Sequence, residues 1–120
     1  MPKKILIIED SGDISGALKI LIELEGYTAV VALTGNEGRE KALTERPDLI
    51  LMDIALPDID GVDLTRELRS QPETAAVPIV CVSSYSGPLE QEALEAGCDA
   101  VYSKTSFMTD YAATIRKYIK

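Results

Sequence analysis

Histidine is absent from the 120 residues of this chain, and cysteine occurs only twice. Without histidine, the chain cannot form the Ser-His or Cys-His nucleophile pairs of many hydrolases, or an imidazole-bound zinc site. Cys81 and Cys98 lie in apolar stretches and fit no metal-binding spacing. With no sign of a secretory signal, we expect free thiols in the core rather than a disulfide.

Long apolar runs and basic clusters are also lacking. No run approaches the roughly 20 residues that span a bilayer. The apolar segment after Lys3 and Lys4 is too short for the core of a signal peptide. The net charge of −8 disfavours a nucleic-acid partner, which needs a clustered basic face, and an anionic membrane surface. We therefore expect a cytoplasmic protein that binds neither nucleic acid nor membrane.

Apolar residues make up 46% of the chain, which is enough for a packed core and argues against disorder. A chain of this length is expected to form one domain, residues 1–120, that buries roughly two thirds of its unfolded surface. No linker, repeat or low-complexity tract interrupts it. We expect a single domain without an attached output module.

Strand and helix patterns alternate along the chain. Short runs rich in apolar or β-branched residues predict five strands, at residues 3–9, 27–33, 48–53, 78–82 and 100–103. Apolar residues at helical spacing predict five helices, at residues 13–25, 36–46, 60–69, 89–96 and 106–119. Asn36 is the predicted cap of the second helix. Because crossovers between parallel strands are right-handed, these units predict a doubly wound α/β fold with a parallel sheet.

Charged residues follow the apolar runs of three predicted strands: Glu9 and Asp10 follow the first run, Asp53 the third and Lys104 the fifth. In an open parallel sheet, ligands bind at the carboxyl ends of the strands. Three carboxylates and one ammonium there would suit a divalent cation and a phosphoryl group. Taken singly, each has an ordinary alternative: Asp10 or Ser11 can cap a helix, Asp53 can start a turn, and Lys104 can be solvated.

The segment at residues 53–61, Asp-Ile-Ala-Leu-Pro-Asp-Ile-Asp-Gly, joins an apolar strand to a proline turn and a helix that begins at glycine. With the acidic pair before it and Ser83 and Lys104 after it, the chain resembles the receiver domains of bacterial response regulators. Their pattern is an acidic pair, Asp-x-x-x-Pro-x-x-Asp-Gly, a Ser or Thr, and a Lys. The resemblance covers essentially all 120 residues and implies a flavodoxin-like sheet of strand order 2-1-3-4-5 with five helices.

The resemblance implies a metal site that holds Mg²⁺. Asp10, Asp53 and the backbone carbonyl of Ala55 would be its protein ligands, and Glu9 would act mainly through bound water. These groups suit Mg²⁺, which prefers oxygen ligands, keeps several waters and bridges to phosphate oxygens.

The resemblance also implies roles in phosphoryl transfer. Asp53 would attack a phosphoryl donor and become an acyl phosphate, Ser83 would hydrogen-bond the phosphoryl group, and Lys104 would pair with its oxygens. A turn or helix-cap serine remains the alternative for Ser83. Such catalysis rests on positioning and charge neutralisation.

The resemblance implies a phosphoacceptor switch rather than an enzyme. Its only expected catalytic activity is removal of its own phosphoryl group. A sensor histidine kinase or phosphotransfer protein would phosphorylate Asp53, and contacts with an unidentified downstream protein would carry the signal. The alternative is a pseudo-receiver that binds its partner without phosphorylation. Enzyme interpretations are weaker: a haloacid-dehalogenase-like phosphatase needs a second acid where Ala55 stands, and Glu9-Asp10 would repel the phosphate of a flavodoxin cofactor.

Three positions depart from the receiver pattern. The aromatic residue expected three places before the lysine is replaced by Val101, and Tyr102 must point to the opposite face of the sheet. Thr105 replaces the usual proline after the lysine, and because a non-proline cis bond is costly we expect the Lys104–Thr105 peptide to be trans. Tyr85 is predicted at the rim of the pocket, either shielding the acyl phosphate or simply exposed.

Overall fold

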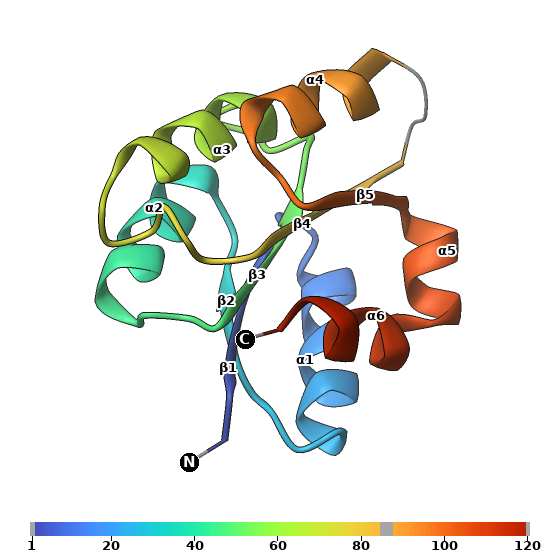
Figure 1. The fold of residues 1–120 in the computed structure, drawn as a ribbon. Helices are drawn as coiled ribbons and strands as arrows, with labels where there is room; N and C mark the ends of the chain where they lie inside the picture. The colour runs from blue at the N-terminus through green and yellow to red at the C-terminus, as the bar shows by residue number, and fades with distance from the viewer. Residues whose placement is uncertain (1, 85–87, 120) are drawn as a thin grey trace.

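The computed structural model describes residues 2–84 and 88–119. Strands and helices alternate along these residues, close to the predicted ranges (Figure 1). The strands are β1 (Lys4–Ile8), β2 (Thr28–Ala32), β3 (Leu49–Asp53), β4 (Ile79–Ser83) and β5 (Ala100–Ser103). The helices are α1 (Gly12–Leu24), α2 (Gly35–Thr44), α3 (Gly61–Ser70), α4 (Pro88–Ala96), α5 (Lys104–Thr109) and α6 (Tyr111–Tyr118).

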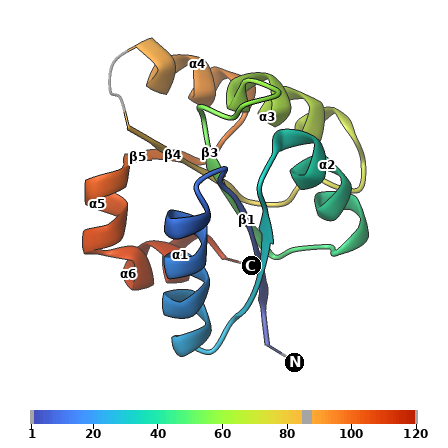
Figure 2. The same ribbon diagram turned by 180° about the vertical axis from the view of Figure 1, so that it is seen from behind.

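The strands form one parallel sheet in the order β2-β1-β3-β4-β5, which confirms the doubly wound, flavodoxin-like architecture. Helices α2, α3 and α4 cover one face, and α1, α5 and α6 cover the other (Figures 1 and 2). Every residue of the central strand β3 is buried. Its uninterrupted apolar run therefore follows from its position, because both of its faces lie under helices.

The last predicted helix is wrong in its extent. The structure has two short helices in place of one helix over 106–119, so the described residues contain six helices rather than five. Helix α5 begins at Lys104, two residues early, because the Ser103 Oγ accepts the Ser106 N–H at 3.1 Å and caps it. Asp110 then leaves the helical conformation, at φ −137° and ψ 38°, and separates α5 from α6.

The cap of helix α2 is Thr34 rather than the predicted Asn36. The Thr34 Oγ1 accepts the Glu37 N–H at 3.1 Å. The N–H groups of Gly35 and Asn36 instead donate to the two carboxylate oxygens of Asp58, at 2.7 and 2.8 Å. These two bonds, that of Asn36 above all, hold the pKa of Asp58 below its usual value. They also attach the loop after β3 to helix α2.

The loop after β3 folds back on itself around Gly61. The Gly61 N–H donates to the carbonyl oxygen of Ile54 at 2.8 Å, and Ala55 pairs with Asp60 in an isolated antiparallel bridge. A Cβ atom at Gly61 would lie 2.7 Å from the Ile54 Cα and 2.8 Å from the Asp53 carbonyl oxygen. Glycine therefore permits the close approach that places the start of α3 beside the end of β3.

The Gly61→Ala variant is expected to be less stable than the wild type by about 1–3 kcal/mol, because the methyl group would press on backbone that cannot move aside cheaply. Urea unfolding would measure the difference. Gly16→Ala is the matched control: it lies in helix α1 with no atom within 4 Å of the added carbon. It should gain up to about 1 kcal/mol. Equal stabilities of Gly61→Ala and wild type would contradict this account.

Two further expectations concern the cysteines and the membrane. Cys81 and Cys98 are buried free thiols on the α3–α4 side of the sheet, as predicted. Within residues 2–84 and 88–119, no helix has the length and apolar character needed to cross a membrane.

Candidate functional site

The carboxyl ends of the strands bring the predicted site residues together. Glu9 and Asp10 follow β1, Asp53 is the last residue of the adjacent strand β3, and Lys104 follows β5. Strand β4 lies between β3 and β5, so the Lys104 side chain must reach across it. In an open parallel sheet this edge is the usual position for a ligand site.

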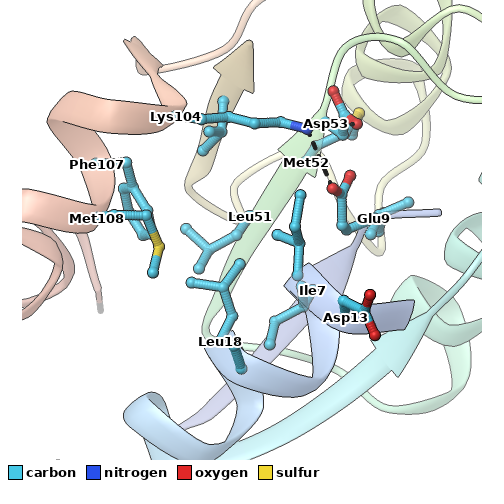
Figure 3. Close-up of a pocket in the computed structure, with 14 residues that line it drawn as sticks. Ile7, Glu9, Asp13, Leu18, Leu51, Met52, Asp53, Lys104, Phe107 and Met108 are labelled. Atoms are coloured by element: carbon cyan, nitrogen blue, oxygen red, sulfur yellow. Dashed lines mark hydrogen bonds and ion pairs between the residues drawn. The ribbon is translucent and has the colours of Figure 1, made fainter. Parts of the chain in front are cut away.

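Lys104 makes an ion pair with each of the two buried carboxylates. Its Nζ lies 3.2 Å from Glu9 Oε1 and 3.6 Å from Asp53 Oδ2 (Figure 3). Glu9 is 3% exposed and Asp53 6% exposed, whereas Asp10 is exposed. Residues 95 positions apart in the sequence are thus in direct contact.

Despite its contact with Lys104, the Glu9 carboxyl is poorly stabilised in its charged form. Burial, together with the neighbouring Asp53 carboxylate, raises the pKa of Glu9 from 4.5 to about 7, although Lys104 acts in the opposite direction. Burial also lowers the pKa of Lys104, but its hydrogen bond to Glu9 and the charge of Asp53 outweigh this, so that pKa is raised. The single positive charge of Lys104 does not balance the negative charges of the two buried carboxylates.

The acidic cluster fits a divalent cation. Glu9, Asp10 and Asp53 each offer a carboxylate oxygen, and these three atoms lie within 4.8 Å of one another. Among the residues that the structure describes, no group donates a hydrogen bond to the buried Glu9 Oε2. A cation would offset the repulsion between the carboxylates. Hard oxygen ligands favour Mg²⁺, Ca²⁺ or Mn²⁺ over softer metals.

The other two predicted site residues lie next to Asp53. Ser83 is 3% exposed and ends β4 one residue beyond Val82, which pairs with Asp53 in the sheet. The Ala55 N–H donates to Asp53 Oδ1 at 3.1 Å, so the loop backbone approaches the carboxylate. The structure thus brings the predicted residues together at one edge of the sheet.

Sequence reasoning missed a cavity of about 250 Å³ that adjoins the acidic cluster between helices α1 and α5 (Figure 3). Its apolar walls come from three places, and include Ile7 and Leu51 of the sheet, Ile14 and Leu18 of α1, and Phe107 and Met108 of α5. The periodicity marks most of these residues as core. It cannot show that the core is incompletely filled there, because packing depends on the position of α5.

Comparison with known proteins identifies the family. Residues 5–116 match the protein family described as "Response regulator receiver domain". The chain belongs to this family. The polar-differentiation response regulator DivK of Brucella anthropi is 33% identical to this receiver domain over 120 residues, covering 99% of this chain and 98% of the relative.

Solved structures of receiver domains are also similar. The BeF₃-activated N-terminal receiver domain of Klebsiella pneumoniae RstA is 30% identical with a TM-score of 0.88, covering 97% of each chain. The receiver domain of the sensor histidine kinase PA1611 from Pseudomonas aeruginosa is 26% identical with a TM-score of 0.89, covering 98% of each chain. That structure has a magnesium ion coordinated in its active site cleft.

The departures from the receiver pattern have the predicted geometry. Val101 packs on the α3–α4 side of the sheet, and Tyr102 packs on the opposite side, where its hydroxyl lies 3.4 Å from that of Tyr118. Tyr102 therefore does not replace the missing ring. The described residues contain no cis peptide, so the Lys104–Thr105 bond is trans, as expected. Tyr85, predicted at the pocket rim, lies outside the described residues.

Proposed function

We propose that this receiver domain is a phosphoacceptor switch in which the Asp53 carboxylate attacks a phosphoryl donor and becomes an acyl phosphate. The observation that carries the proposal is the convergence of Glu9, Asp10 and Lys104 on the buried Asp53. The donor would be a sensor histidine kinase or phosphotransfer protein in the cytoplasm. Protein contacts with a downstream target would then carry the signal, without catalytic turnover of a substrate.

The metal proposed for the acidic cluster is Mg²⁺. Asp10, Asp53 and the backbone carbonyl of Ala55 would hold it, with Glu9 acting through water. The donor atoms fit, because Mg²⁺ takes oxygen ligands and retains water. The magnesium ion in the similar PA1611 receiver domain supports this choice. When bound, the ion supplies positive charge to the oxygens of the transferred group.

The remaining residues would act on the phosphoryl group. Lys104 is positioned to neutralise its oxygens, since its Nζ already lies 3.6 Å from Asp53 Oδ2. Ser83 ends the strand next to that of Asp53 and would donate its hydroxyl hydrogen. Moving a conformational equilibrium from 1:99 to 99:1 takes about 5.5 kcal/mol, and one charge-assisted hydrogen bond supplies about 1.5–3 kcal/mol. Both residues are therefore needed for a complete switch.

Asp10→Asn is expected to weaken Mg²⁺ binding at least about tenfold, because it removes a charged ligand from the cluster. Calorimetric titration with Mg²⁺ would measure the dissociation constant. Asp13→Asn removes the same charge from an exposed residue of α1 that is not in the cluster. It should weaken binding no more than about fivefold. Equal effects of the two variants would argue for a general charge effect instead of ligation by Asp10.

Acetyl phosphate provides the test of the proposed function. Incubation with Mg²⁺ should add the mass of one phosphate to the intact chain, and EDTA should prevent it. Borohydride reduces an acyl phosphate, so mass spectrometry of the reduced peptide would locate the modification at Asp53. Failure of the folded protein to gain phosphate from acetyl phosphate or a second small donor would overturn the proposal.

That failure would favour the pseudo-receiver, which binds a partner without phosphorylation. The observation behind this second candidate is Val101, which lies on the α3–α4 side of the sheet and has no ring to couple Asp53 to the protein surface. The complete set of acidic residues opposes it. A pseudo-receiver has no need to keep two buried carboxylates beside one lysine.

A further inference from the structure

Strand β2 lies at one edge of the sheet, with β1 as its neighbour. Residues 27–34, which contain β2, include no charged side chain and are rich in β-branched and apolar types. An exposed edge of this composition is a template for pairing with a strand of another chain. The contacts of the outward backbone groups of β2 therefore decide whether this edge is open to a partner.

The hydrogen bonds to β1 fix which backbone groups of β2 face outward. The Thr28 N–H and the Ala32 carbonyl oxygen bond to the residues that flank β1, at 2.9 and 3.0 Å. In a parallel pair, every second residue of a strand directs its backbone groups to the neighbouring strand. The backbone groups of Ala29 and Val31 therefore point away from the sheet.

Two lysines, one from each flanking helix, occupy the outward carbonyl oxygens. Lys19 Nζ of α1 donates to the Ala29 carbonyl oxygen at 3.4 Å, and Lys41 Nζ of α2 donates to that of Val31 at 2.7 Å. Helices α1 and α2 cover opposite faces of the sheet, so the two side chains reach the edge from both sides (Figures 1 and 2). A strand added to this edge would meet an ammonium group at both acceptors.

Each lysine is also paired with a glutamate one turn away on its own helix. Lys19 Nζ lies 3.9 Å from Glu23 Oε2, and Lys41 Nζ lies 3.2 Å from Glu37 Oε1. The two lysine side chains are 47% and 34% exposed, so their charges are not buried in the core. Exposed ion pairs of this kind contribute little to the stability of a fold. Their arrangement on both sides of one edge strand points to a different role.

We propose that Lys19 and Lys41 close the β2 edge to strand addition, and that the partner they exclude is a second copy of this chain. A second copy presents the same uncharged segment, and two such edges related by a two-fold axis would pair antiparallel. Each ammonium occupies a carbonyl oxygen that this pairing needs, and the lysines of the two copies would repel one another. This role does not involve Asp53 and is independent of the proposed phosphoryl switch.

The double variant Lys19→Met/Lys41→Met tests the proposal, because methionine keeps a long apolar side chain but cannot donate to a carbonyl oxygen. We expect it to dimerise at least about tenfold more tightly than the wild type, since the outward carbonyls of β2 become free to accept hydrogen bonds. Sedimentation velocity over a concentration series would compare the association constants. Working in EDTA without a phosphoryl donor keeps the result separate from any phosphorylation of Asp53.

The matched control is Arg66→Met/Lys117→Met, which removes two exposed positive charges from α3 and α6 instead. It changes the net charge by the same amount and should associate like the wild type. Circular dichroism would verify that each variant folds. The single variant Lys41→Met, which removes the shorter of the two bonds, repeats the test with one substitution and should also dimerise more tightly than the wild type.

Amide hydrogen exchange would locate the interface of the dimer. The N–H groups of Ala29 and Val31 should exchange more slowly in the dimer of the double variant, because they would donate to the partner strand. Three results would each overturn the proposal: methionine variants that associate no more tightly than the wild type, a control that dimerises equally, or a dimer without added protection in β2.

Discussion

The Asp53→Asn variant is expected to gain no phosphate from acetyl phosphate and Mg²⁺, a complete loss relative to the wild type. The reason is chemical: an amide oxygen is not the nucleophile that a carboxylate is, and an acyl phosphate at this position requires the carboxylate. Asparagine has nearly the same shape and keeps an oxygen that can accept the Ala55 N–H. The fold should therefore survive, and circular dichroism would verify it.

The control for this result is Asp63→Asn. Asp63 is exposed in the first turn of α3 and pairs only with Arg66 among the described residues, so it should be labelled like the wild type. Intact-mass spectrometry over a time course would compare the three proteins. If Asp53→Asn were labelled as fully as the wild type, another residue would be the acceptor and the role proposed for Asp53 would be wrong.

The Glu9→Gln variant is expected to be more stable than the wild type above pH 7 when metal is removed by EDTA. Glu9 has a pKa near 4.5 when unfolded and about 7 in the folded protein. Between these values the folded state holds more protons, so the stability of the wild type falls as pH rises from 4.5 to 7. The full effect of this shift is about 3 kcal/mol. Glutamine carries no charge at any pH, so the variant does not lose stability in this way.

Thermal unfolding at several pH values would measure this difference. The two proteins should be closest below pH 4.5, where Glu9 is protonated in both states, and furthest apart above pH 7. Mg²⁺ should narrow the gap, because a cation stabilises the charged Glu9 and the ion binds the folded wild type more tightly. Glu40→Gln, an exposed position on α2, should follow the wild type at every pH. A wild type that is the more stable protein in EDTA at pH 8 would contradict this interpretation.

The sequence predicts some parts of the fold better than others. The apolar runs of β1, β3 and β4 are local signals, and the structure agrees with them. The cap of helix α2 was misplaced because Thr34 and Asn36 are both good capping residues. Only the position of Asp58, which binds the N–H of Asn36, distinguishes them.

The break at Asp110 could not be read from periodicity. Phe107 and Ile115 keep helical spacing across it and both reach the same core, so the pattern is continuous while the backbone is not. Aspartate is a weak helix former, but a single such residue often remains within a helix. Helix α5 ends at this break, and its residues Phe107 and Met108 line the cavity beside α1.

The sequence by itself determined the alternation of strands and helices and the chemical identity of the site, because hydrophobic period and residue type are properties of short segments. Tertiary structure alone decided that Lys104 contacts both Glu9 and Asp53, that burial and the neighbouring Asp53 raise the pKa of Glu9, and that α5 leaves space beside α1. These features depend on distances between distant segments and on burial from water. Neither the distances nor the burial can be inferred from a single residue or a short segment of the chain.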